Sequence, residues 1–532
     1  MAAFPATAAG MTISDQLARH ARTIPDAVAF SFQGTHRTYR QLDGRVSRLA
    51  NAIGERGVGI GDRVAVVTYN GLEMVEAYLA CARVGAICVP INFRLVADEV
   101  GYQLADSGAV LAIVDAALAP TVAQARAQAT SVRACLVVGR DGDSPADSDG
   151  YEDALRSASP EQLPTAVDLQ APAVIMYTSG TTGRPKGAVL THYNLLIQTV
   201  SKTINVGLPP DCRTWLISTP LFHIGGLAAM LTSLLVGGRV VLGRSVAFDP
   251  VLTVDLLERE RINCCFFVPA QWQAICDLPD IADRDLSALR LISWGAAPAP
   301  TTLLRRMIEL FGHADITTSF GQTECSAVTT ILRGEDALGK IGSVGTPILN
   351  VEVRIVDEYG GDVPQGQVGE IVYRGPSVMR EYWNKPVETA EAFAGGWFHS
   401  GDLVRQDSDG YIYVVDRLKD MIISGGENIY CVEVEDVVAA HPKVAGVAVV
   451  GVPHERWGET PLAVVVPVDG ADPPTDEDIT RWCRERLAAY KCPRGVSIMD
   501  DLPRNASGKV RKNELKERAR SGVTVKVGGG HA

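Results

Sequence analysis

Residues 177 to 187 form a segment rich in glycine and hydroxyl side chains, with the sequence Tyr-Thr-Ser-Gly-Thr-Thr-Gly-Arg-Pro-Lys-Gly. It lies between an apolar run, Ala173 to Met176, and a helix-like stretch that begins near Thr191. Glycines let the backbone turn N–H groups toward an anion, hydroxyls donate further hydrogen bonds, and Lys186 adds a positive charge. A Ser/Thr/Gly linker is the plainer interpretation, but it does not require this order of residues. We therefore expect a polyphosphate site formed by Thr178, Ser179, Gly180, Thr181, Thr182, Gly183 and Lys186.

The segment is not the P-loop of kinases and GTPases, because Gly-x-x-x-x-Gly-Lys-[Ser/Thr] is not matched here. Four further motifs follow it in chain order. They are Phe320-Gly321-Gln322-Thr323-Glu324, Trp397-Phe398-His399-Ser400-Gly401-Asp402, Asp416-Arg417-Leu418-Lys419-Asp420 and Pro503-Arg504-Asn505-Ala506-Ser507-Gly508-Lys509. Together the five motifs closely resemble the signatures of the adenylate-forming acyl-CoA synthetases, over nearly the whole chain from about Ser14 to Lys512. Five motifs in order, in a chain of matching length, argue against chance.

The resemblance implies an AMP-forming carboxylic acid:CoA ligase that uses ATP, CoA and Mg²⁺. Such an enzyme brings a carboxylate against the α-phosphate of ATP, so it needs cations to offset the repulsion between the two anions. The family's catalytic lysine maps onto Lys509, whose plainer interpretation is a solvated lysine in a basic run. Glu324 is expected to bind Mg²⁺, and Thr323 to contact phosphate or the acyl carboxyl group.

The same resemblance places the nucleoside. Asp402 matches the carboxylate that accepts both ribose hydroxyls, and Arg417 matches a residue that contacts ribose and phosphate. Without the motifs, these two would be an ordinary turn aspartate and a surface arginine. Adenine is expected along one stretch with an aromatic face opposite, and the residues involved are Gly295, Ala296, Ala297, Pro298, Phe320, Gly321 and Gln322. At this position the family more commonly has tyrosine. Phe320 keeps the aromatic face for stacking but lacks the hydroxyl.

For the second half-reaction, the resemblance implies that a small domain rotates about Lys419 and withdraws Lys509. A loop with Gly425 and Gly426 would then let the pantetheine arm of CoA pass close to the backbone, although a plain turn is the alternative.

The acid is expected to contact His223, Ile224, Val268, Trp294, Gly295 and Gly321. His223 could instead be a satisfied core residue, and Trp294 either closes the floor of the acyl pocket or only packs in the core. Because this lining is apolar, the sequence predicts a fatty acid as the substrate. The close rival is an aryl- or cinnamate-type acid. Further alternatives are an amino-acid-activating domain of a peptide synthetase, a luciferase-like oxygenase and, from another class, a noncatalytic nucleotide sensor on the same fold.

The composition excludes some functions. The net charge of −12 and pI near 5.3 argue against a nucleic-acid binder, which needs a basic surface. Eleven cysteines without a Cys-x-x-Cys pattern fit reduced thiols, and we expect a cytoplasmic protein. The first residues do not resemble a signal peptide, and no run approaches the ~20 apolar residues of a membrane span. A homodimer is left open.

Alternation of short β-rich runs with helical patterns predicts an α/β fold. We expect a large N-terminal domain, residues 1–416, of mostly parallel sheets covered by helices, with a small β-subdomain after Asn350. A hinge at 417–419 would lead to a small mobile α+β C-terminal domain, residues 420–532. The tail after about residue 520 is expected to be disordered.

Overall fold

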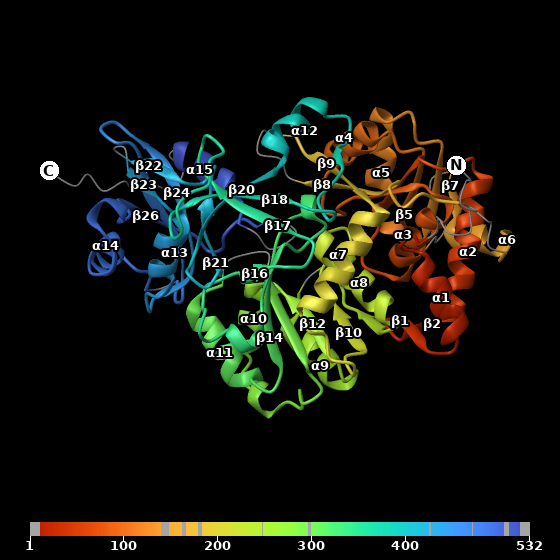
Figure 1. The fold of residues 1–532 in the computed structure, drawn as a ribbon, viewed down its shortest axis with the longest axis horizontal. Helices are drawn as coiled ribbons and strands as arrows, with labels where there is room; N and C mark the ends of the chain where they lie inside the picture. Colours follow the sequence, from red (N-terminus) through yellow and green to blue (C-terminus); the bar gives the residue numbers. More distant parts are fainter. Residues whose placement is uncertain are drawn as a thin grey trace.

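The computed structural model describes residues 11–139, 148–161, 166–178, 184–246, 248–295, 299–424, 427–470, 472–504 and 510–521. Its strands form two large sheets, which belong to a large N-terminal domain, and two smaller ones (Figure 1). The C-terminal domain, in blue, extends from one end of the molecule in this view. The predicted α/β architecture is therefore confirmed.

The first large sheet is mainly parallel, and antiparallel β9 and β19 extend one of its edges. In spatial order its strands are β19 (Glu381–Tyr382), β9 (Lys186–Thr191), β8 (Pro172–Thr178), β4 (Ile87–Pro90), β3 (Arg63–Val67), β5 (Leu111–Asp115), β6 (Ala134–Val138) and β7 (Ser148–Gly150).

The second large sheet has parallel central strands and antiparallel strands at both edges. Its order is β16 (Thr346–Pro347), β15 (Thr330–Leu332), β14 (Asp315–Phe320), β13 (Leu291–Gly295), β12 (Cys264–Phe267), β10 (Thr214–Ile217), β11 (Arg239–Leu242), β1 (Val28–Phe32) and β2 (Thr35–Thr38).

The two smaller sheets match the change of rhythm that the sequence predicts after Asn350. One is antiparallel, with the order β17 (Glu352–Val356), β18 (Gly369–Arg374), β20 (Phe398–Gln406) and β21 (Ile412–Arg417). The other has the order β23 (Glu427–Ile429), β22 (Ile422–Ser424), β25 (Gly458–Pro467) and β24 (Val444–His454), and β26 (Gly495–Ile498) also pairs with β25.

Helices cover both faces of the large sheets. The N-terminal domain contains α1 (Asp15–Thr23), α2 (Tyr39–Glu55), α3 (Leu72–Val84), α4 (Ala97–Ser107), α5 (Ala119–Ala125), α6 (Tyr151–Ser157), α7 (His192–Asn205), α8 (Ile224–Val236), α9 (Pro250–Arg259), α10 (Pro269–Cys276), α11 (Thr301–Phe311) and α12 (Pro386–Ala392). The last three helices are α13 (Cys431–Ala439), α14 (Asp476–Arg484) and α15 (Lys512–Arg520).

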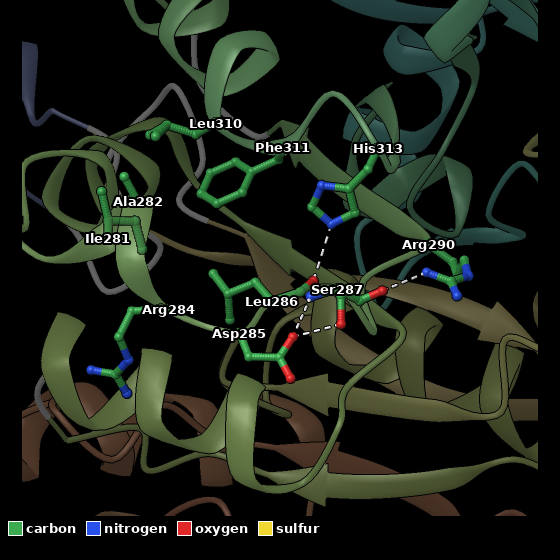
Figure 2. Close-up of a pocket in the computed structure, with 10 residues that line it drawn as sticks. All are labelled: Ile281, Ala282, Arg284, Asp285, Leu286, Ser287, Arg290, Leu310, Phe311 and His313. Atoms are coloured by element: carbon green, nitrogen blue, oxygen red, sulfur yellow. Dashed lines mark hydrogen bonds between the residues drawn. The ribbon is translucent and has the colours of Figure 1, made fainter.

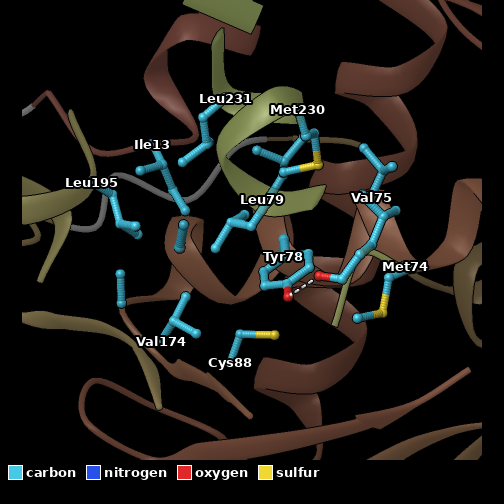
Figure 3. Close-up of a cluster of buried hydrophobic side chains, with 14 of the residues drawn as sticks. Ile13, Met74, Val75, Tyr78, Leu79, Cys88, Val174, Leu195, Met230 and Leu231 are labelled. Atoms are coloured by element: carbon cyan, nitrogen blue, oxygen red, sulfur yellow. Dashed lines mark hydrogen bonds between the residues drawn. The ribbon is translucent and has the colours of Figure 1, made fainter. Parts of the chain in front are cut away.

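The largest apolar core lies between the two large sheets. It joins side chains of α3, α8 and strands of both sheets, including Tyr78, Met230 and Val174 (Figure 3). A second core packs α9, α10 and α11 on the outer face of the sheet that contains β13, and a third packs α4 and α5 on the outer face of the other sheet. This layering fixes the two sheets relative to each other, and with them the loops at their strand ends.

The structure has a strand between the phosphate-loop segment and the helix predicted near Thr191. Lys186 begins β9, which pairs antiparallel with β8. The loop therefore closes a β-hairpin, and α7 begins only after β9, with Thr191 capping its N-terminus. No described helix is long and apolar enough to cross a membrane.

Candidate functional site

Four segments at the carboxyl ends of parallel strands bring the predicted adenine and acyl residues to one edge of the second large sheet. His223 follows β10, Val268 follows β12, Gly295 ends β13 and Phe320 ends β14. Ligands gather at the carboxyl ends of strands in such sheets.

Two positions at this edge must be glycine, because a neighbouring backbone carbonyl lies too close to leave room for a side chain. A Cβ on Gly295 would lie 2.1 Å from the carbonyl oxygen of Ser319, and one on Gly321 would lie 2.3 Å from that of Ala327. Gly321 also has φ +157°. The following turn contains Ser326 and Ala327, with φ +57° and +109°, although neither is glycine. Such backbone is costly and concentrates at functional sites.

Glu324 is the buried centre of the predicted phosphate and metal region. Its Oε1 accepts hydrogen bonds from the Thr178 hydroxyl at 3.3 Å and from the Tyr382 hydroxyl at 2.9 Å. The Nζ of Lys186 lies 4.7 Å from the centre of the Tyr382 ring. Three predicted residues, Thr178, Lys186 and Glu324, are thus brought together, and Tyr382 connects them.

Tyr177, which precedes the phosphate loop, is held by residues outside the motifs that were not predicted from the sequence. Asp106 accepts a hydrogen bond from the Tyr177 hydroxyl at 2.8 Å and pairs with Lys385 Nζ at 2.9 Å. Burial, followed by the charge of Asp106, raises the pKa of Tyr177. Asp106 and Tyr382 are far in sequence from the motif residues that they contact, and Lys385 is far from Asp106, so only the fold shows these contacts. Residues 179–183 of the loop lie outside the described residues.

Asp402 and Arg417 face each other across β20 and β21. They are register partners, and Arg417 Nε lies 2.5 Å from Asp402 Oδ1. Asp402 is 2 % exposed and its N–H bonds to the Ser400 hydroxyl, so its carboxylate is fixed in place. The pair that the resemblance assigns to ribose is therefore preformed.

Of the predicted hinge, CoA-binding and catalytic residues Lys419, Gly425, Gly426 and Lys509, the structure describes only Lys419. Lys419 is exposed in the turn after β21, where Asp420 N–H bonds to the Arg417 carbonyl. Gly425, Gly426 and Lys509 lie outside the described residues, as do Ala296, Ala297 and Pro298. The hinge and the domain boundaries stay predictions.

His223 is held by the first large sheet and its helices. Asn70 Oδ1 accepts the Leu221 N–H at 2.8 Å, and the buried Tyr78 hydroxyl donates to the Leu221 carbonyl at 2.7 Å. Two residues on, the His223 ring lies 4.5 Å from that of Phe222, and its buried Nε2 has no partner among the described residues. Burial, followed by the charge of Arg94, lowers the pKa of His223 to about 4, so its ring is neutral near pH 7. A neutral ring with a free nitrogen suits a substrate contact better than a satisfied core residue.

Phe266 and Trp294 lie on adjacent strands but have different surroundings. Trp294 is 6 % exposed and belongs to the core beneath α10 and α11, which favours the packing alternative for this residue. Phe266 is only partly buried, and its Cε2 lies 3.3 Å from the position a Cβ would take on Gly295. Because β strands alternate their side chains, Phe266 and not Phe267 reaches the predicted acyl region.

A cavity of about 330 Å³ lies elsewhere, beside α11 (Figure 2). Its lining includes Arg284, whose guanidinium pairs with Asp255 and lies 2.9 Å from Glu258. His313 bonds to the Leu286 carbonyl at 3.1 Å. None of the predicted site residues lines this cavity.

Comparison with known proteins agrees with this geometry. Residues 17–383 match the AMP-binding enzyme family, and residues 433–509 match the AMP-binding enzyme C-terminal domain. The chain therefore belongs to the AMP-binding enzyme family.

Among curated relatives, a feruloyl-CoA synthase of Amycolatopsis sp is 44% identical over 94% of this chain and 97% of its own. An indoleacetate–CoA ligase of Aromatoleum aromaticum is 38% identical over 95% of this chain and 98% of its own. A long-chain fatty-acid–CoA ligase of Mycobacterium tuberculosis is 36% identical over 90% of this chain and 92% of its own.

Among solved structures, the O-succinylbenzoate coenzyme A synthetase of Bacillus subtilis in complex with ATP and magnesium ion has a TM-score of 0.83 and 32% identity. It matches over 94% of this chain and 99% of its own. The coarser prediction, an AMP-forming carboxylic acid:CoA ligase, is confirmed. The fatty-acid prediction is supported less well than its aryl alternative, because the more similar relatives act on aryl acids. The homodimer and the cytoplasmic location stay predictions.

Proposed function

We propose that this protein is an AMP-forming CoA ligase for an aromatic carboxylic acid of the cinnamate type. The observation that carries the proposal is the 44% identity to a feruloyl-CoA synthase along nearly the full length of both chains. The fatty-acid–CoA ligase is less similar, at 36%.

The side chains near the predicted acyl region fit a flat, apolar substrate. Phe222 lies 5.5 Å from Phe93, which in turn lies 4.8 Å from Tyr69, with the rings edge to face in both pairs. Phe266 adds a further ring beside Gly295. Aromatic rings favour offset or edge-to-face packing against one another, which an aryl acid provides and a saturated chain does not. The unpartnered Nε2 of neutral His223 supplies a polar contact in this apolar setting.

In the first half-reaction, a carboxylate oxygen of the acid attacks the α-phosphorus of ATP, and the bond to the bridging oxygen of diphosphate breaks. Asp402 and Arg417 hold the ribose, and Phe320 stacks on adenine. Lys509 offsets the charge that develops on the α-phosphoryl oxygens. Thr178, Lys186 and the intervening loop hold the departing diphosphate.

Mg²⁺ fits the donor set at Glu324. No cluster of three or more His, Cys, Asp or Glu side chains suited to a metal occurs among the described residues. Mg²⁺ bound to nucleotide phosphates needs only one or two carboxylates, and Glu324 supplies one, already oriented by Thr178 and Tyr382. Bound there, the ion would neutralise phosphate charge.

In the second half-reaction, the CoA sulfur attacks the acyl carbon and AMP leaves with the bonding electrons. We place the required domain rotation at Lys419, and the passage of the pantetheine arm beside Gly425 and Gly426.

The test is a substrate panel scored for AMP and thioester formation. It compares kcat/KM for ferulate, 4-coumarate, benzoate and indoleacetate with that for saturated acids from short to long. The proposal expects a cinnamate to be best. A higher kcat/KM for any saturated acid than for every aromatic acid would overturn it and restore the fatty-acid prediction.

A further inference from the structure

Three charged side chains that the proposed mechanism does not use lie where β21 contacts α13. Lys512 Nζ lies 2.7 Å from Glu435 Oε1, and both side chains are largely buried, at 15 % and 18 % exposure. Asp416, at the end of β21, is 2 % exposed. Burial alone would lower the pKa of Lys512, but Glu435 and Asp416 together raise it above its usual range, so the lysine stays charged.

Each member of this group is tied to a different element. Glu435 lies on α13, and its Oε1 also accepts the Val449 N–H of β24 at 2.7 Å. Asp416 Oδ2 accepts the N–H of Cys431, the first residue of α13, at 2.5 Å. Lys512 is the first residue of α15. The cluster therefore joins β21 of the N-terminal domain to α13 and α15 of the C-terminal domain.

The two ends of the cluster lie beside the two halves of the adenylation site. At one end, Asp416 Oδ1 accepts the N–H of Arg417, whose side chain pairs with Asp402. At the other end, Lys512 follows Lys509 by three residues, so their Cα atoms are at most ~11 Å apart. Arg511, the residue before Lys512, is held as well, because its N–H bonds to the Pro503 carbonyl at 2.7 Å.

A buried ion pair is weak evidence for stability, since desolvation offsets much of its attraction. Its geometry is specific, however. Here the ion pair holds α15 against α13, and the bond from the Cys431 N–H to Asp416 holds the start of α13 at β21. We propose that Lys512 is a positioning residue: its ion pair with Glu435 holds α15, and the segment just before it, against α13, whose first residue is bonded to the strand end that carries Arg417. This inference rests on the proposed adenylation chemistry.

The test uses Lys512→Met, which removes the charge and keeps most of the length, and Lys512→Arg, which keeps the charge. Arg518→Met is the matched control, because Arg518 lies on the same helix, is 51 % exposed and pairs only at the surface with Glu514. Adenylation is measured as pyrophosphate exchange into ATP. The second half-reaction is measured with supplied acyl-adenylate and CoA, and folding by thermal unfolding.

We expect Lys512→Met to lose ~10-fold to ~100-fold in kcat of adenylation, the scale of misplacing a reacting group by about 1 Å. Thioester formation from acyl-adenylate should stay near that of the unmodified enzyme, Lys512→Arg should recover most of the adenylation rate, and Arg518→Met should be unaffected. An equal loss in both half-reactions, or no loss in a folded variant, would overturn the proposal.

If Lys512→Met does not fold, the double variant Glu435→Met, Lys512→Met replaces the pair with apolar side chains and leaves no unpaired charge on Glu435. A persistent adenylation defect in this folded variant supports positioning, and restored adenylation overturns it. Failure of the unmodified enzyme to exchange pyrophosphate with any acid would instead contradict the proposed function itself.

Discussion

The nucleotide side and the acyl side of this site are built in different ways. On the nucleotide side, Asp402 is paired with Arg417, and Glu324 accepts hydrogen bonds from Thr178 and Tyr382. On the acyl side, the buried Nε2 atom of His223 has no partner among the described residues. Chemistry shared by a whole family can be preorganised through fixed polar contacts, whereas the choice of acid depends on the shape and polarity of a surface that the substrate completes.

The comparison predicts its largest effect at Lys509, on the nucleotide side. Lys509→Ala should lose at least ~10²-fold in adenylation, because it removes one preorganised donor to the developing charge. Conversion of supplied acyl-adenylate with CoA should survive. Half-reaction assays check this, and equal losses in both steps would remove Lys509 from the proposed role.

Glu324 should control the requirement for Mg²⁺. Glu324→Gln keeps the size of the side chain and removes its charge, so we expect the Mg²⁺ concentration for half-maximal adenylation to rise by ~10-fold or more. Tyr382→Phe removes only one hydrogen bond to that carboxylate, so it should raise this Mg²⁺ concentration less. A magnesium titration of both variants is the measurement. An unchanged requirement in Glu324→Gln would place the metal elsewhere.

Two buried histidines allow stability to be separated from function. Burial lowers the pKa of both His192 and His223 to about 4, below the ordinary value of 6.5. The unfolded chain therefore binds more protons between these pH values. The neutral rings contribute full stability above pH 6.5, and this contribution is lost as the pH falls through about 4.

At pH 5, each histidine should account for a loss on the order of 1–2 kcal/mol in the free energy of unfolding relative to pH 8. His192→Gln and His223→Gln should both flatten the acid side of a stability–pH curve from denaturant unfolding. His192 follows the end of β9 that pairs with Pro172, the first residue of β8, whereas the candidate site lies at the other end of β8. Only His223→Gln should therefore also change kcat/KM for the acid. A similar change in kcat/KM in both variants would contradict the placement of His223, but not His192, at the acyl site.

Much of the fold could be predicted from the sequence because local patterns determine it. The alternation of short β-rich runs with helical patterns corresponds to parallel strands joined by helices, as in β3, α3 and β4. The strand β9 was not predicted, because residues 186–191 follow a glycine-rich segment directly and their pairing with β8 is a tertiary contact without a periodic signal.

The candidate site shows the same division. Motif residues such as Glu324 and Asp402 are recognisable because the chemistry requires their types in a fixed order. Their supports are not recognisable, since Tyr382 reaches Glu324 across 58 positions and Asp106 reaches Tyr177 across 71. Strand alternation decides between the two alternatives for Trp294, because it places this side chain on the core face with Phe267.

Phe266 and Trp294 provide the finest test of the acyl side. Phe266 lies beside Gly295 and is partly buried, whereas Trp294 packs beneath α10 and α11. Phe266→Leu should therefore lower kcat/KM for cinnamates by ~3-fold to ~10-fold relative to saturated acids, the worth of about one aromatic contact. Trp294→Phe leaves a space in the core, so it should lower the free energy of unfolding and keep the order of acids. The measurement is kcat/KM across the same substrate panel for both variants, together with denaturant unfolding. If Trp294→Phe shifted the preference toward longer chains while Phe266→Leu did not, the indole would be the pocket floor. In that case the acyl side would extend through the face of β13 that we assign to the core.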